Sequence, residues 1–425
     1  MPNVADPPLT DTNQAAAVTA SRSAVAGWVS KGLGNTLQSQ TMIANYFPVW
    51  VIAVMGGSDG LLTLSNTVIM ILMIGLGPWL GAISDLLPRR MPVLIVTTVA
   101  SVVLFSLAVQ SDLRLSLVIY STANLCFQSS LIIYDALLPT VSTEENRGRV
   151  NGLAVGLGYL GSLASVVIGG LVLSRGGDYQ AVFRITGLAT LLLALPCFIL
   201  VREPARAVAP LAPLALARGA FTDVATTLAH ATHLPILTRF LICRTLYSMA
   251  GGAIGIFMAV YLTVQLGYAS GDKDRLLLAA ILGAVAGGLL WGRVVDAIGP
   301  RDSLLAILGV WSLALFAIAA SGLGVLPNAT LWLSAPLAGF ALGGTWAADR
   351  PLMAALSPPA QLGTFFGLYG LSGRLALLIG PLIWTLVSQV LGLGRPAALL
   401  ALLALVIVAT VLLRAIPASV GRITG

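Results

Sequence analysis

Long apolar runs separated by short polar segments are the main feature of this chain. A helix needs about 20 mostly apolar residues to cross the hydrocarbon core of a bilayer, and these runs reach or approach that length. The pattern predicts twelve membrane-spanning helices, at residues 33–55, 61–83, 92–110, 115–138, 150–173, 181–201, 236–266, 276–297, 303–321, 331–349, 362–390 and 397–414. An even number of spans places both ends of the chain on one side of the membrane.

The polar segments divide the chain into five parts. We predict a polar cytoplasmic tail, a six-helix bundle, a cytoplasmic linker, a second six-helix bundle and a C-terminal tail, at residues 1–32, 33–201, 202–235, 236–414 and 415–425. Within the linker, apolar residues recur every three or four positions, at Leu214, Ala217, Phe221, Val224 and Leu228. This spacing predicts a short amphipathic helix that lies along the cytoplasmic face of the membrane.

Composition agrees with a membrane protein. Hydrophobic residues make up 57% of the chain and charged residues 9%, whereas a soluble domain carries about 25% charge. The net charge of +7 does not indicate a nucleic-acid partner, because basic residues such as Arg89, Arg147 and Arg301 gather in the loops on one side. That bias places both termini in the cytoplasm. Only Lys31 and Lys273 are lysines among 23 basic residues, which favours a GC-rich prokaryote and hence a plasma-membrane location.

One loop signature occurs twice, once in each half of the chain, and the copies begin 211 positions apart. Its glycine permits close helix approach, its aspartate can pair with a neighbouring arginine or helix terminus, and its arginines hold the loop inside. Making and breaking such contacts would latch the inward-open and outward-open states; the alternative is a topology signal alone. The gating residues predicted from it are Gly81, Asp85, Arg89 and Arg90, and in the second copy Gly292, Asp296 and Arg301. The duplicated pattern resembles the loop signature of the major facilitator superfamily.

Polar residues within the spans are the candidates for substrate contact, because burying them in lipid is costly. Asn35 and Gln38 share one face of span 1 with Thr41 and Asn45, and span 4 carries a similar pair, Asn124 and Gln128. Both stripes are also consistent with hydrogen bonding between helices.

Charged residues within the spans give a second set of candidates. Arg374 lies twelve residues into span 11, so about 18 Å along a helix, near the middle of the membrane. It would bind an anionic group or form a structural ion pair, and Arg244 would do the same or extend to the cytoplasm. Asp135 and Asp349 end spans 4 and 10. They would either bind a coupling proton or pair with Arg350 and other loop arginines, and we favour pairing.

No motif in the chain indicates an enzyme, a cofactor or a metal site. The sequence Gly156-Leu-Gly158-Tyr-Leu-Gly161 matches a dinucleotide fingerprint, but it follows no strand and lies within an apolar helix, where small residues serve helix packing. His230 and His233 have no other histidine or cysteine near them in the sequence. No cluster of His, Cys or carboxylates has ligand or catalytic spacing.

A narrower resemblance rests on motifs in both halves. They are Tyr134-Asp135-Ala136-Leu137-Leu138-Pro139, Gly148-Arg149-Val150-Asn151-Gly152, Gly158-Tyr159-Leu160-Gly161, Gly343-Gly344-Thr345, Phe365-Phe366-Gly367-Leu368-Tyr369, Ser372-Gly373-Arg374 and Gly380-Pro381, with Trp28 and Asn35 in span 1. On these motifs the chain resembles the vacuole effluxer-like permeases. The resemblance implies a major facilitator fold with twelve spans. Characterised relatives are linked to amino-acid export from fungal vacuoles, whereas bacterial members largely lack assigned substrates.

The resemblance makes Arg374 the counterpart of the family's basic residue in span 11, and Arg350 that of its loop arginine. The chain also departs from the family's pattern. The family's Tyr-Asp in span 1 is Lys31-Gly32 here, a Gln in span 10 is Trp346, a neighbouring Ser is Asp349, and the acidic position after the span-11 tyrosine is Gly370. Two acidic positions are lost and one is gained, so proton coupling and amino-acid specificity do not carry over directly.

The sequence thus predicts an all-α polytopic transporter of the major facilitator type, with two pseudo-symmetric six-helix bundles and no enzymatic activity. It would act as a monomer on a small zwitterionic or anionic solute, by alternating access and with export favoured. The alternatives are a drug or toxic-metabolite exporter, and a membrane scaffold that transports nothing. The predicted substrate contacts are Asn35, Gln38, Asn124, Gln128, Arg244, Tyr247, Trp346, Tyr369 and Arg374.

Overall fold

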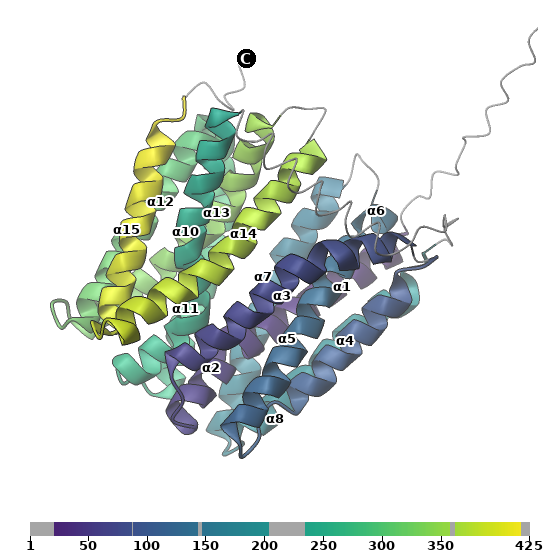
Figure 1. Ribbon diagram of the computed structural model, residues 1–425, viewed down its shortest axis with the longest axis horizontal. Helices are drawn as coiled ribbons and strands as arrows, with labels where there is room; N and C mark the ends of the chain where they lie inside the picture. Colours follow the sequence, from purple (N-terminus) through teal and green to yellow (C-terminus); the bar gives the residue numbers. More distant parts are fainter. Residues whose placement is uncertain (1–20, 87, 143–146, 204–233, 358–361, 418–425) are drawn as a thin grey trace, which may run out of the picture.

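The computed structural model describes residues 21–86, 88–142, 147–203, 234–357 and 362–417, and nearly all of them are helical (Figure 1). Each of the twelve apolar runs coincides with a helical segment. Within the described residues, nine helices are long and apolar enough to cross a membrane, and the helix Met91–Ser106 is a shorter apolar one. The prediction of an all-helical polytopic protein is confirmed, while the count of twelve spans stays a prediction.

The first group of helices covers the N-terminal half. Its first segment runs from α1 through two π-helical stretches, and five longer helices and one short one follow. They are α1 (Arg22–Ser39), η1 (Gln40–Asn45), α2 (Phe47–Val49), η2 (Trp50–Val54), α3 (Asp59–Leu86), α4 (Met91–Ser106), α5 (Leu113–Asp135), α6 (Leu138–Val141), α7 (Arg147–Ser174) and α8 (Tyr179–Leu200). The predicted linker helix, residues 214–228, lies outside the described residues.

The second group covers the C-terminal half and packs beside the first along its length (Figure 1). Its elements are α10 (Pro235–Val260), η3 (Tyr261–Gln265), α11 (Ser270–Ile298), α12 (Pro300–Gly322), η4 (Asn328–Thr330), α13 (Leu331–Leu356), α14 (Leu362–Thr385), η6 (Leu386–Val390) and α15 (Gly394–Arg414). We call the end where α8 ends and α10 begins the linker end. The opposite end, where α3 and α11 begin, is the far end.

Small residues allow the closest helix contacts. Gly283 and Gly287 on α11 face backbone carbonyls of α13, and Gly339 and Gly343 on α13 face those of α11, so closely that a Cβ at any of the four would overlap its neighbour. Between helices that lie in lipid, such close backbone approach provides much of the packing energy.

Aromatic side chains fill the interior of each group. In the first, Phe47 stacks on Tyr120 with ring centroids 4.1 Å apart, and in the second Phe257 stacks on Trp384 at 5.0 Å. Outward-facing positions are also apolar: Ile199 and Leu289 are more than 60% exposed. An apolar outer surface suits helices that are surrounded by lipid rather than water.

Candidate functional site

A cavity of about 170 Å³ lies between the two groups of helices. The first group contributes Gln40, Asn45 and Tyr159 to its wall, and the second contributes residues of α10, α11, α12 and α13. Most of the wall is aliphatic, and no charged side chain lines it among the described residues. The lining from η1 is notable because π-helical turns inside α-helices occur frequently at functional sites.

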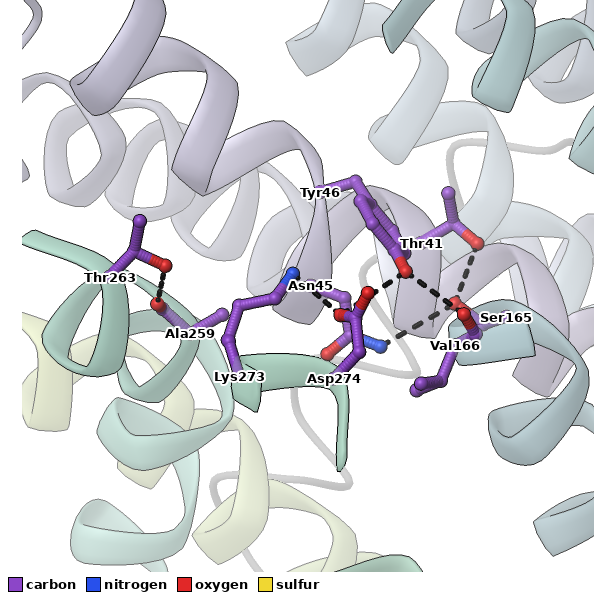
Figure 2. Close-up of polar contacts among 9 residues, drawn as sticks. All are labelled: Thr41, Asn45, Tyr46, Ser165, Val166, Ala259, Thr263, Lys273 and Asp274. Carbon is purple, nitrogen blue, oxygen red and sulfur yellow. Dashed lines mark hydrogen bonds and ion pairs between the residues drawn. The ribbon is translucent and has the colours of Figure 1, made fainter. Parts of the chain in front are cut away.

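A polar network that includes Asn45 of the cavity wall connects the first helical segment with α7 and α11 (Figure 2). Thr41 and Asn45 of η1 both contact the Ser165 hydroxyl of α7, at 2.8 and 3.5 Å. The next residue, Tyr46, donates from its hydroxyl to the Val166 carbonyl at 3.1 Å, and lies 3.4 Å from a carboxylate oxygen of Asp274 on α11. This last contact joins the two groups.

Asp274 belongs to a buried ion pair. Its carboxylate lies 2.8 Å from the ammonium of Lys273, which is 2% exposed and also sits over the Tyr46 ring at 4.5 Å. Gly170 of α7 lies against the other carboxylate oxygen, so a Cβ there would be 3.2 Å from it. We call Tyr46, Gly169, Gly170, Lys273 and Asp274 the α7–α11 junction.

A second contact between the groups lies along α3 and α14. At the far end, Asp59 receives two hydrogen bonds of 2.9 Å from the Arg395 guanidinium and one of 2.9 Å from the Trp384 indole. Further contacts continue toward the linker end: the Gly60 amide to Gln389 Oε1 (3.0 Å), the Thr63 and Thr385 hydroxyls (2.5 Å), and the Asn66 amide to the Leu377 carbonyl (2.8 Å). We call this series, from Asp59 to Leu377, the α3–α14 junction.

Arg244, Asp349 and Tyr369 form a cluster within the second group. The Arg244 guanidinium lies 3.5 Å from the Asp349 carboxylate and 3.5 Å above the centre of the Tyr369 ring, and it donates to the Ser372 hydroxyl at 2.6 Å. Tyr247, also buried, is within electrostatic reach of this ion pair. The structure thus brings three predicted contact residues together with Asp349, which is paired.

Arg374 lies at the boundary between the two groups. It is half-buried, and its guanidinium rests against Gly77 of α3, where a Cβ would lie 3.1 Å away. Among the described residues Arg374 makes no hydrogen bond or ion pair, and the nearby Asp135 of α5 is within electrostatic reach of both Arg374 and Arg350. Arg350 itself lies 5.9 Å from the centre of the exposed Trp346 ring.

The remaining predicted contacts point into the first group. The Asn35 amide oxygen accepts from the Lys31 ammonium, and Gln38 donates to Ser101 of α4 at 2.7 Å. Asn124 is buried beside Tyr120. Gln128 is half-buried. None of the nine predicted contact residues lines the 170 Å³ cavity.

The described residues of the duplicated loop signature bind within their own groups. Arg90 donates to the Ala136 carbonyl at 2.6 Å, and Arg301 donates to the carbonyls of Arg414 and Ile416 at 2.7 and 3.1 Å. Asp296 and Arg89 are exposed, and Gly292 is half-buried. The side chain of Asp85, like the surroundings of Gly81, lies outside what the structure describes. The gating role stays a prediction.

Sequence reasoning missed both junctions. Asp59, Asp274 and Arg395 stand within a few residues of loops, where a charge is ordinarily solvated, and Tyr46 is an aromatic residue in an apolar run. A weak signal was present, because Asp59 and Asp274 occupy similar places at the far-end starts of α3 and α11. In the described part of the chain, no group of three or more His, Cys, Asp or Glu residues is placed to hold a metal ion.

Comparison with known proteins decides the family. The model of the family described as vacuole effluxer Atg22 like matches residues 57–424. The chain belongs to this family.

Two curated relatives, both uncharacterised, extend the match. An MFS-type transporter, YxiO of Bacillus subtilis (strain 168), is 23% identical over 362 residues, which is 80% of this chain and 81% of the relative. A protein of Aquifex aeolicus (strain VF5) is also 23% identical, over 83% of this chain and 86% of its own.

Solved structures give the fold. A mutant of the nucleoside transporter NupG superposes with a TM-score of 0.71 at 12% identity, covering 93% of this chain and 98% of that one. A bacterial homologue of the human lysosomal transporter Spinster, solved inward-facing and unoccupied, gives 0.66 at 13% identity, covering 92% and 95%. The predicted major facilitator fold is confirmed. This member of the Atg22-like family is a multi-pass membrane protein whose family and structural neighbours are transporters rather than enzymes.

Proposed function

We propose that the protein is a secondary transporter that exports a small zwitterionic or anionic metabolite, such as an amino acid, across the plasma membrane. It acts as a monomer by alternating access, with both termini in the cytoplasm, so that the far end faces the outside. The two junctions then hold the outer side closed, and the cavity opens to one side of the membrane at a time. The positive-inside bias of the loops supports this orientation.

The observation that carries the choice of solute is Arg374. Its guanidinium lies where the two groups meet, and no described residue forms an ion pair with it. An arginine held at membrane depth needs a negative partner, and a solute carboxylate supplies one in the geometry that a guanidinium binds best. Arg244 is already paired with Asp349, whereas Arg374 has Asp135 only within electrostatic reach, so Arg374 is the cation proposed to bind the solute.

Arg374 lies outside the wall of the 170 Å³ cavity. We therefore place solute entry beside Arg374 on the linker-end side and occlusion nearer the far end.

A drug or toxic-metabolite exporter is the second candidate. The aliphatic lining of the cavity between the groups favours it, because such a wall accepts a hydrophobic solute without pairing its charge. A scaffold that transports nothing is a third candidate, which is tested by whether a cavity-lining cysteine changes its labelling between states.

Thermal stabilisation of the purified protein tests the solute class before the solute itself is identified. The panel holds amino acids, peptides, organic anions and hydrophobic cations. A solute at 100 times its Kd stabilises by about 2.7 kcal/mol, which is a measurable rise in Tm. We expect a rise with one zwitterionic or anionic solute, lost in Arg374→Gln and kept in Arg114→Gln.

Arg114 is a suitable control because it is exposed at the start of α5, away from the boundary between the groups. Counterflow of the same solute in proteoliposomes then tests transport itself. A rise with hydrophobic cations alone would favour the exporter of drugs. A rise that survives Arg374→Gln would contradict the role of Arg374.

A further inference from the structure

We propose that Asp274 is the binding site of a coupling proton, and that protonation of its carboxylate releases the α7–α11 junction and opens the far end. The proposal rests on the proposed function, because it takes the far end to be the outer gate of a transporter. It assigns proton binding to a residue outside the sites predicted from the sequence.

The ion pair between Asp274 and Lys273 is buried. Asp274 is 8% and Lys273 2% exposed, and they form a direct ion pair of 2.8 Å in the first turns of α11. An ion pair removed from water is maintained only while both charges are present, because the loss of one leaves the other buried and uncompensated. The closed junction is therefore sensitive to the charge state of Asp274.

The ion pair also packs against the other group of helices. The Asp274 carboxylate contacts the Tyr46 hydroxyl (Figure 2). It also lies next to Gly170 of α7, and the Lys273 ammonium lies over the Tyr46 ring. Tyr46 is itself fixed, since its ring fills the space over Gly169 and its hydroxyl donates to the Val166 carbonyl. The junction therefore joins parts of both groups at the far end.

Asp274 is the group in this junction that changes its charge. Within the described residues, the titratable groups in electrostatic reach of Asp274 are Lys273 on its own helix, Tyr46 at the end of η1 and Tyr179 at the start of α8. The nearby Asp272 and Arg275 pair with each other at the surface, 3.0 Å apart. The Asp274 carboxylate lies one turn from the exposed Ser270 and Gly271, so it is close to far-end water.

Protonation of Asp274 leaves the positive charge of Lys273 without its partner. A hydronium ion at the far end transfers its proton to a carboxylate oxygen of Asp274 and becomes water, and no other covalent bond changes. Lys273 then loses its counter-charge while it is 2% exposed. The ring of Tyr46 compensates only part of that cost, since a cation over an aromatic face is stabilised modestly. Opening lets water reach the ammonium, and release of the proton allows the junction to form again.

The α3–α14 junction is built differently, because its carboxylate is paired across the boundary between the groups. Asp59 receives three hydrogen bonds, two of them from a guanidinium that remains charged in proteins. It therefore serves as an internal comparison, because its removal should loosen the far end at every pH.

Cysteine labelling tests the proposal without a known solute. Ala44 lines the cavity, so Ala44→Cys in a background without Cys126, Cys197 and Cys243 reports access from outside in intact cells, with a membrane-impermeant maleimide. Rates at pH 5 and pH 8 are divided by those of Ser111→Cys, an exposed far-end loop position, to correct for thiol ionisation. We expect the corrected rate to rise by about tenfold at pH 5, which corresponds to about 1.4 kcal/mol.

Three variants decide the outcome. Asp274→Asn should label rapidly at both pH values, Asp272→Asn should keep the pH step, and Asp59→Asn should raise labelling at both pH values while keeping the step. A pH step that persists in Asp274→Asn, or its absence from the unmodified sequence, would overturn the proposal. The labelling uses no solute, so a silent solute panel would count against the proposed function and leave this result standing.

Discussion

The two junctions between the groups of helices are equivalent in position and different in construction. Each lies where the second long segment of one group meets the fifth of the other, α3 with α14 and α11 with α7, and each also uses a neighbouring element: Arg395 is in α15, and Tyr46 follows η1. In the α3–α14 junction the ion pair itself spans the boundary, as Asp59 and Arg395 belong to different groups. In the α7–α11 junction the ion pair lies within α11, and an uncharged tyrosine makes the contact across the boundary.

The two junctions therefore differ in strength and in their response to a change of charge. A carboxylate held by a guanidinium fork and an indole is a strong and rigid connection. A carboxylate balanced by its own neighbour and touching a phenol at 3.4 Å is a weaker connection whose charge can change. A protein that must open one end and close it again can use the first type to define the closed geometry and the second to time its release.

The largest expected effect is on the α3–α14 junction. Asp59→Asn leaves the Arg395 guanidinium without its counter-charge, and loss of one partner of a buried pair costs about 3 kcal/mol. We expect a clear fall in the Tm of the detergent-solubilised protein. Asp112→Asn is the matched control, because that carboxylate caps exposed amides at the start of α5 and should change the Tm much less. Equal falls in the two variants would show that the junction contributes nothing particular.

The next largest loss of stability is expected where the Tyr46 ring packs against Gly169. A Cβ in Gly169→Ala would overlap the Tyr46 ring, and overpacking of this kind costs about 1–3 kcal/mol. Gly156→Ala on the same helix is the control, since nothing lies within 4 Å of a Cβ there and α7 should gain slightly in helix propensity. The Tm of Gly169→Ala should fall while that of Gly156→Ala stays level or rises. A level Tm in both would mean that the Tyr46 ring moves freely.

A smaller effect is expected from the hydroxyl alone. Tyr46→Phe keeps the ring under Lys273 and removes the contacts to Val166 and Asp274, and a hydrogen bond contributes about 1 kcal/mol net. Stability should fall by about that amount, and acid-dependent labelling at Ala44→Cys should begin at a higher pH, because closure is weaker. Tyr261→Phe removes a comparable hydroxyl contact, to Ile318 inside the second group, and should lower stability without changing the pH response.

The smallest change in stability is expected at Gly170, next to the Asp274 carboxylate. In Gly170→Ala the new Cβ would meet the Asp274 carboxylate at 3.2 Å, a tight contact that a small shift relieves. We expect a change in stability below about 1 kcal/mol. Corrected labelling from the far end should nonetheless increase, because the carboxylate no longer seats fully against α7. An unchanged labelling rate would show that α7 merely borders Asp274 without holding it.

The helices were readable from the sequence because bilayer crossing imposes a length and a polarity on each segment. The polar face of span 1 was harder to interpret. At regular helical spacing Asn35, Gln38 and Asn45 share one face, yet in the structure the first two bind within the first group toward α1 and α4, and Asn45 turns toward α7. The π-helical turn at Gln40–Asn45 shifts the register of the second half of the segment, and no simple sequence signal announces it.

The junctions were beyond sequence reasoning for a different reason. Tyr46 and Asp274 are 228 positions apart, and Asp59 and Arg395 are 336 apart, so their pairing depends on how two independently packed groups meet. Arg244 and Asp349, by contrast, were both identified as candidates, because a charge within an apolar run is conspicuous. Their mutual pairing came only with the packing of α10 against α13.

The fluorescence emission of Trp384 should differ between the closed and open states of the far end. Its indole donates to Asp59 across the boundary between the groups while its ring stacks on Phe257 within the second group. Separation of the far end would break the first contact and leave the second, moving one indole N–H from a carboxylate to water. The difference in tryptophan emission between the unmodified protein and Trp384→Phe, which keeps the stack, would then follow the movement of the gate in real time and without any attached dye.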